Sequence, residues 1–276
     1  SGVYLDYFLP EVHDSLEGTI DILENNRVIR SYTSKKDTSF KSWPGGPSPK
    51  MTLPHKQGFN RTHWDFRREQ LPSVDKVFVY GSYVGSTVAP GTYSARLSYG
   101  QAVKEVSIEI LPNPNLEYSA VDFNEQQQLL VNIEEAIRKI HLSVSEMRGA
   151  QDQLKHYSKM LKGKAGFESL YNNAVAIEKK LVEWEAQLIQ PNQKTFQDVI
   201  NFNNMLNAEF MHLKGFVDTD DPVLTQGSKD RYDDLIKTWN QYKMELDQII
   251  EDDFKSFEND YRDAQVPVLM VNLDSE

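Results

Sequence analysis

"GFNRTHWDFRR", residues 58–68, decides how the first half of the chain folds. Polar or charged residues alternate here with aromatic ones, and in a β-strand successive side chains point to opposite faces. One face then carries Asn60, Thr62, Trp64 and Phe66, and the other carries Arg61, His63, Asp65 and Arg67. We therefore expect a strand whose aromatic face points into a β-sheet core and whose charged face points to solvent.

Runs of similar character surround this stretch, and they are rich in β-branched and aromatic residues, as strands are. They cover residues 3–9, 18–24, 27–33, 89–99 and 102–111. Asn25-Asn26 and Gly100-Gln101 stand where tight hairpin turns are needed, and Pro90-Gly91 suits a type II turn. Six to eight short strands at this spacing predict an immunoglobulin-like β-sandwich over residues 1–113.

Residues 42–58, "SWPGGPSPKMTLPHKQG", are rich in Pro and Gly and predict an irregular surface loop. Trp43 is the one aromatic residue that this scheme leaves outside a core. It is a candidate ligand or domain contact; the alternative, which we favour because exposed Trp is uncommon, is that it folds back on the sandwich.

The period of the apolar residues changes after a linker at 114–121, where Asp122 and Glu125 resemble a capping box. Steps of three and four then mark long amphipathic helices over residues 122–264, followed by a tail at 265–276. Such narrow stripes are typical of antiparallel helices in a bundle. We expect three arms of comparable length, the middle one broken near Pro191, with the sandwich beside the start of the first helix. Four separate helices are the alternative.

Composition narrows the classes of partner. The 276 residues contain no Cys and carry a net charge of −11. Residues 1–113 are nearly neutral, whereas residues 114–276 hold 29 acidic against 17 basic side chains, which argues against nucleic acid and anionic membranes as partners. No apolar run approaches the length of a membrane span. The chain begins at Ser1 rather than Met, so we expect a processed product or an excised fragment.

No motif of known chemistry accounts for a reaction. His63 and Asp65 lie at acid/base spacing, but the sequence fixes no nucleophile beside them. "DTDDP", 218–222, lacks the glycine of a calcium loop and has Lys229 where a bidentate Glu belongs. The remaining His residues show no metal-ligand spacing. We therefore expect no catalytic residue, no cofactor and no metal site.

Several stretches resemble the C-terminal region of bacterial BNR-repeat proteins, which are sortilin-like β-propeller proteins often labelled glycosyl-hydrolase-like. These are "GVYLDYFLP", "IDILENNRVIRSY", "GFNRTHWDFRR" and "VAPGTYSARLSYGQAVKEVSIEILPNP". In that family a G-x-N-R-x-x-W-D-x-R strand and an A-P-G-T-Y turn belong to an immunoglobulin-like module that follows the propeller. The BNR repeats themselves are absent from this sequence.

The resemblance implies a detached β-sandwich and helical bundle, since any hydrolase activity of the family would lie in the propeller. We expect a non-catalytic structural or interaction module from a larger exported protein, periplasmic or extracellular. Its partner would be the upstream propeller of the same polypeptide or another protein. The alternative is a carbohydrate-binding accessory domain, with Trp43 as the ligand contact.

Overall fold

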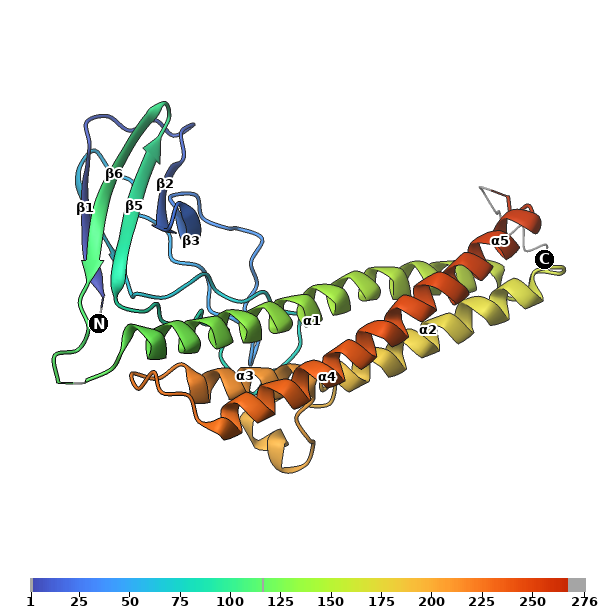
Figure 1. Ribbon diagram of the computed structural model, residues 1–276. Helices are drawn as coiled ribbons and strands as arrows, with labels where there is room; N and C mark the ends of the chain where they lie inside the picture. Colours follow the sequence, from blue (N-terminus) through green and yellow to red (C-terminus); the bar gives the residue numbers. More distant parts are fainter. Residues whose placement is uncertain (1, 116, 268–276) are drawn as a thin grey trace.

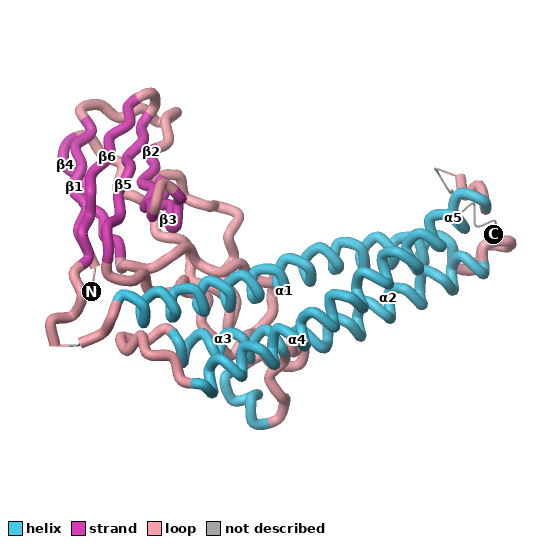
Figure 2. The backbone as a smooth tube through the Cα atoms, viewed as in Figure 1, coloured by secondary structure: helices cyan, strands magenta, loops and turns pink. Residues whose placement is uncertain are grey.

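The computed structural model describes residues 2–115 and 117–267, and places six strands before a set of long helices (Figures 1 and 2). The strands are β1 (Val3–Leu9), β2 (Gly18–Glu24), β3 (Arg27–Thr33), β4 (Gly58–Trp64), β5 (Gly91–Tyr99) and β6 (Ala102–Ile110). The helices are α1 (Ala120–Leu161), α2 (Glu168–Leu188), η1 (Phe196–Ile200), α3 (Leu206–Val217), α4 (Gln226–Gln248), η2 (Ile249–Phe254) and α5 (Lys255–Asp263). The predicted order of β-sheet part and then helical part is confirmed.

The strands form two antiparallel sheets. One holds only β1 and β4, and the other has the order β3-β2-β5-β6. Asn60, Thr62 and Trp64 of β4 are buried, and Trp64 has no exposed surface, so the predicted inner face of residues 58–64 is confirmed. Trp64 packs edge-on against Tyr93 of β5, which joins the two sheets through one core.

Strand β4 ends sooner than the alternation predicted. Phe66 has φ of 61°, a left-handed conformation in which a strand cannot continue. Phe66 still contacts Trp64 edge-on, but Arg67 turns away from solvent toward the helices, where it meets Asp218. The expectation that Asp65 and Arg67 would lie on a solvent-facing strand surface was therefore wrong.

The turns follow local residue chemistry in most places. Asn25 and Asn26 have φ of 50° and 64°, as the tight hairpin between β2 and β3 requires. Gly100, with φ of 57°, turns the chain from β5 into β6. Gly91 instead has no positive φ and is the first residue of β5, so the predicted type II turn is absent there.

Helix α1 begins at a capping box one turn earlier than predicted. The Ser119 side chain accepts a hydrogen bond from the Asp122 N–H, and the Asp122 carboxylate accepts one from the Ser119 N–H. Asp122 is thus the third residue of the helix rather than its cap. At 42 residues α1 is about 63 Å long, and it forms the spine of the helical part.

The other helices lie along this spine. Helix α2 runs back beside α1, and α3 then lies beside the half of α1 nearest the sheets (Figure 1). Helices α4, η2 and α5 follow one another without a break and return to the far end. η2 is a stretch of π-helix, which the 3.6-residue period of the sequence did not reveal.

A segment without helices or strands, residues 65–89, joins the two parts; we call it the joint segment. The two halves of the joint segment run side by side, since the Arg68 N–H donates to Ser86 O at 2.9 Å and the Leu71 N–H donates to Tyr83 O at 2.8 Å. It supplies five side chains to the hydrophobic core of the helices: Leu71, Val74, Val77, Val79 and Tyr83. A sequence division at residue 113 therefore does not separate the two cores.

Within the described residues, no helix has the length and apolar character needed to cross a membrane. Of the predicted tail, residues 268–276 lie outside the described part of the chain.

Candidate functional site

The solvent-facing side of the β1–β4 sheet carries a ladder of three cross-strand pairs, which we call the outer face. Antiparallel register sets Tyr4 opposite His63, Asp6 opposite Arg61 and Phe8 opposite Phe59. Side chains directly opposite one another interact, and aromatic and opposite-charge pairs are the stabilising kinds. Residues 58–64 therefore have a second role, because the same alternation of side chains that buries one face of β4 also creates the outer face.

The middle pair of the outer face is a two-pronged ion pair. Arg61 Nε lies 2.6 Å from Asp6 Oδ1, and Arg61 Nη2 lies 2.8 Å from Asp6 Oδ2. The hydrogen bond from Arg61 lowers the pKa of Asp6, so this carboxylate stays ionised. The Arg61 guanidinium also lies 5.3 Å from the centre of the Tyr4 ring, within the range of a cation–π contact.

Aromatic rings flank the ion pair on both sides. The Phe8 and Phe59 rings meet edge-on at 5.1 Å, and the Tyr4 and His63 rings are tilted at 5.1 Å. The exposed fraction is 66% for Tyr4, 54% for Phe8 and 77% for Phe59. Three large exposed aromatics on one regular surface are uncommon, and such patches mark binding sites in soluble proteins.

The inner side of the same sheet holds the outer face rigid. Trp64 Nε1 donates to Arg67 O at 2.9 Å, and the Asn60 amide donates to Lys56 O at 2.8 Å and to Gly58 O at 3.0 Å. Both side chains are buried. Binding residues on strands that are fixed in this way lose little conformational entropy when a partner binds.

Trp43, the residue singled out from the sequence as a candidate ligand contact, folds back. Its indole N–H donates to Val77 O at 2.8 Å, and its ring lies 6.4 Å from that of Phe40. The ring also covers Gly46, where any Cβ would lie within 3 Å of it. Trp43 is half-buried against the joint segment and is far less open than the aromatics of the outer face.

The joint segment is fixed to the helices by a buried polar cluster. Asp218, just after α3, accepts hydrogen bonds from Arg67 Nη1 at 2.8 Å and from the Thr87 N–H at 3.0 Å. Glu134 of α1 accepts one from the Ser86 N–H at 2.6 Å. Lys214 of α3 donates to Val84 O and lies 3.8 Å from Glu134 Oε1. Backbone groups of an irregular segment are thus satisfied by charged side chains of two helices.

Burial sets the charge balance of this cluster. Glu134 is 7% exposed and Lys214 is 4% exposed. Desolvation raises the pKa of Glu134 and lowers the pKa of Lys214, and each charge counteracts the shift of the other. Removal of one partner would leave the other charge buried alone, which is strongly destabilising.

His141 of α1 is a second buried polar contact to the joint segment. Its Nδ1 lies 2.7 Å from Pro72 O, and its Nε2 lies 3.1 Å from the Asn207 side-chain nitrogen. The ring has no exposed surface, and burial lowers its pKa to about 4. Neutral His141 therefore donates through Nδ1 and accepts from Asn207 at Nε2.

Glu134, His141 and Lys214 were not predicted from the sequence to be buried polar contacts. Glu134 and His141 are seven residues apart, two helical turns, so they lie on one side of α1, adjacent to the apolar stripe. This seven-residue spacing of two titratable residues beside the apolar stripe could have been recognised in the sequence. Their partners on the joint segment were not detectable, because that segment has no period.

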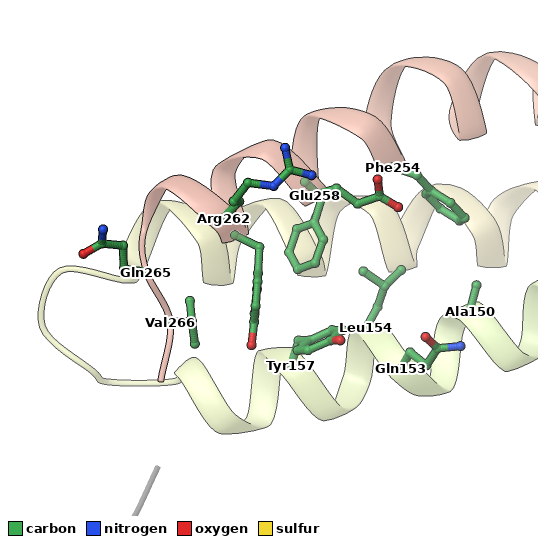
Figure 3. Close-up of a pocket in the computed structure, with 11 residues that line it drawn as sticks. Ala150, Gln153, Leu154, Tyr157, Phe254, Glu258, Arg262, Gln265 and Val266 are labelled. Atoms are coloured by element: carbon green, nitrogen blue, oxygen red, sulfur yellow. The ribbon is translucent and has the colours of Figure 1, made fainter. Parts of the chain in front are cut away.

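A separate groove of about 550 Å³ lies at the far end of the helices. Figure 3 shows Tyr157 and Leu154 of α1 facing Glu258 and Phe254 of the opposite helical segment across it. Tyr157 packs against Phe257 at 5.7 Å and against Tyr261 at 5.2 Å. These rings mostly contact one another, and none of the groove's charged residues is buried.

The described residues contain no group of three or more His, Asp or Glu side chains placed to bind a metal ion. Comparisons of this chain with protein-family models, curated proteins and solved structures found no match. The outer face and the buried polar cluster that fixes the joint segment to the helices are the two features that bear on function.

Proposed function

We propose that this chain is a non-catalytic interaction module that binds a protein partner through the outer face of the β1–β4 sheet. The observation that carries the proposal is the exposure of Tyr4, Phe8 and Phe59 around the Asp6–Arg61 ion pair on a rigid sheet. Aromatic residues and Arg are enriched among residues that dominate the energy of protein interfaces. The joint segment, which follows β4 directly and is bonded to the helices, would hold the face at a set position relative to them.

The resemblance to BNR-repeat proteins suggests which partner to test. We propose that the chain is the C-terminal part of a larger exported protein, acting in the periplasm or outside the cell. Its outer face would then dock on the propeller of the same polypeptide or on another protein. The aromatic strand that carries the resemblance also carries Phe59 and Arg61 of the outer face.

We also propose that the sheets form an immunoglobulin-like sandwich and that the helices form three arms. Two facing sheets around a common core support an immunoglobulin-like sandwich. Helices α2 and α3 follow one another along α1, opposite the α4–α5 segment, with the η1 connection between them, and this arrangement supports three arms with a break near Pro191. Spin labels at positions 125 and 260 test this layout: we expect a separation of most of the ~63 Å length of α1. Close approach of the labels would instead indicate four separate arms.

The first step in testing the binding proposal is to determine whether further sequence precedes Ser1 in the native polypeptide. If it encodes Asp-box repeats, that propeller is expressed separately and its affinity for this chain is measured by calorimetry. We expect Phe59→Ala and Arg61→Glu to weaken binding. Phe216→Ala on α3 is the matched control, because Phe216 is 67% exposed but lies away from the outer face. Equal affinities for Phe59→Ala and the unaltered chain would refute the proposal.

A carbohydrate-binding accessory role is the second candidate, and the same exposed rings favour it, since flat aromatic side chains stack on the apolar faces of sugars. A glycan array with the whole chain tests it. Saturable binding that is lost in Phe59→Ala but kept in Trp43→Ala would assign a glycan to the outer face. Loss in Trp43→Ala alone would place the glycan at residues 42–58.

A further inference from the structure

The two sheets leave one side of the sandwich open, and β1 and β6 are the strands that border it. Among the described residues β1 pairs only with β4, and β6 pairs only with β5. Each strand therefore keeps one row of backbone N–H and C=O groups without a strand partner. Such edges accept an added strand, and the peptide backbone then supplies much of the affinity.

A hollow of about 450 Å³ lies between these two edges, a volume typical of ligand sites. Seven of the residues that line it are apolar residues of the inner faces of both sheets: Val3, Leu5, Ile20, Ala95, Leu97, Val106 and Ile108. Tyr4, Asp6, Tyr7, Phe8 and Ser107 also line it, and Asp6 is neutralised by Arg61. Val106 is on the inner face of β6, opposite Ala95, yet 58% of it is exposed. The inner surface at this position is therefore not covered by the two-stranded sheet.

One uncompensated charge stands in this apolar wall. Lys104 lies on the same face of β6 as Val106 and lines the hollow. It forms no ion pair with any residue in the described part of the chain, and its sequence neighbour Glu105 is bound to Arg96 and Ser94 on the other face. A carboxylate on an incoming segment would complement this amine.

A second copy of this chain fits the edge poorly. The side of β6 that points away from the hollow carries Glu105 and Glu109. Arg96 neutralises Glu105, but Glu109 has no ion pair in the described part of the chain, so antiparallel pairing of two β6 strands would bring two unpaired Glu109 carboxylates onto one face of a continuous sheet, and like charges across strands are destabilising. The charge pattern therefore favours a strand from a different protein.

We propose that the open side between β1 and β6 is a strand-addition site. It binds an extended segment of a partner protein, with alternate apolar side chains in the hollow and a carboxylate opposite Lys104. This inference rests on the proposed interaction function, and it defines how the partner is held. The added strand would pair with the free edge of β1 or of β6 and close the open side.

The test uses the whole chain and synthetic eight-residue peptides in which Val alternates with Ser. Glu, Gln or Lys replaces the first or the last Val, so that both strand directions are covered. Binding is measured by calorimetry, and hydrogen exchange locates the peptide. We expect saturable binding with Glu preferred over Lys, and slower exchange of β1 or β6 amides but not of β3 amides.

Two valines of β6 provide a matched pair of variants. Val106 and Val103 are 58% and 56% exposed, but Val106 faces the hollow and Val103 faces the opposite side. A charge buried without a partner is costly, so Val106→Arg should weaken peptide binding about tenfold or more, whereas Val103→Arg should change it less than about twofold. Lys104→Glu should reverse the preference, so that the Lys peptide binds better than the Glu peptide.

Absence of saturable binding by every peptide would overturn the proposal, as would equal effects of the two Val substitutions or protection confined to other strands. Concentration-dependent protection of β6 amides without peptide would show a second copy there and also overturn it. The variant Phe59→Ala distinguishes failure of the strand-addition proposal from failure of the proposed function. If the propeller loses affinity for Phe59→Ala but not for Val106→Arg, binding through the outer face is supported and strand addition is refuted.

Discussion

Trp64 and Leu71 are both almost completely buried and only seven residues apart, yet they belong to different cores. Trp64 lies on a regular strand and packs between the two sheets. Leu71 lies on the joint segment and packs with the helices. The comparison shows that a change of sequence period marks where elements change type, but not where one core ends and another begins.

The largest expected effect tests the sheet side of this comparison. Trp64→Ala should lower the free energy of unfolding of the sandwich by about 3–5 kcal/mol, because a large buried ring leaves a cavity. His63→Ala, one residue away on the outer face, should change it by less than about 0.5 kcal/mol. Hydrogen exchange of the β2 and β5 amides at increasing denaturant concentration measures both, because Trp64→Ala removes the Trp of the sheet core and the other three Trp residues lie outside that core. The reverse order would mean that the strand faces are exchanged.

Leu71→Ala tests the helical side. Although Leu71 lies in neither a helix nor a strand, its removal should destabilise the helical part by about 2–5 kcal/mol, as for other buried leucines. The circular dichroism signal at 222 nm reports the helices during denaturant unfolding. A transition unchanged from that of the parent chain would show that the joint segment does not stabilise the helical core.

The burial of His141 against the joint segment predicts that the free energy of unfolding depends on pH. The folded-state pKa is about 4, below the usual value near 6.5, so the unfolded chain binds the proton more readily. The contribution of buried neutral His141 to the free energy of unfolding is therefore fully present above pH 6.5. It is lost as the pH falls toward 4, for a total of about 3 kcal/mol.

His141→Gln is the control for this effect, because it can keep hydrogen bonds to Pro72 and Asn207 without titrating in this range. The difference in unfolding free energy between the two chains, measured from pH 7.5 to 4, isolates the His141 contribution. A difference that is constant with pH would contradict the prediction.

The smallest expected effect concerns Tyr83, whose buried hydroxyl has no hydrogen-bond partner among the described residues. Desolvation raises the pKa of this phenol. Tyr83→Phe should stabilise the helical core by about 1 kcal/mol, because an unsatisfied polar group is removed while the ring remains. Thermal unfolding measures the shift. A loss of stability would show that a bound water satisfies the hydroxyl.

Much of the fold could be predicted because local chemistry and global packing agree there. Asn25-Asn26 takes the positive φ that its hairpin needs, and the apolar stripe of α1 is buried along almost its whole length. The inner face of β4 follows directly from alternation. In these elements a single period determines both the backbone and the buried side.

The rest depends on contacts between segments distant in sequence. Arg67 reads as a strand residue by alternation, but its partner is Asp218, 151 positions later. The same limit applied to the candidate site. Trp43 was chosen because it stood outside a predicted element, whereas Tyr4, Phe8 and Phe59 became a site only when register placed them on one face.

The polar cluster at the joint segment has a mechanical consequence. Helix α1 is attached to the joint segment at Glu134, and the 27 residues from there to Leu161 span about 40 Å, so this part of the helix acts as a lever whose tip moves by about 0.7 Å for each degree of rotation at the attachment. Glu134, Lys214 and Asp218 resist that rotation at three points on two helices and the turn beyond α3. Their substitution would therefore be detected most sensitively as a broader distribution of distances between the outer face and the far end of the helices.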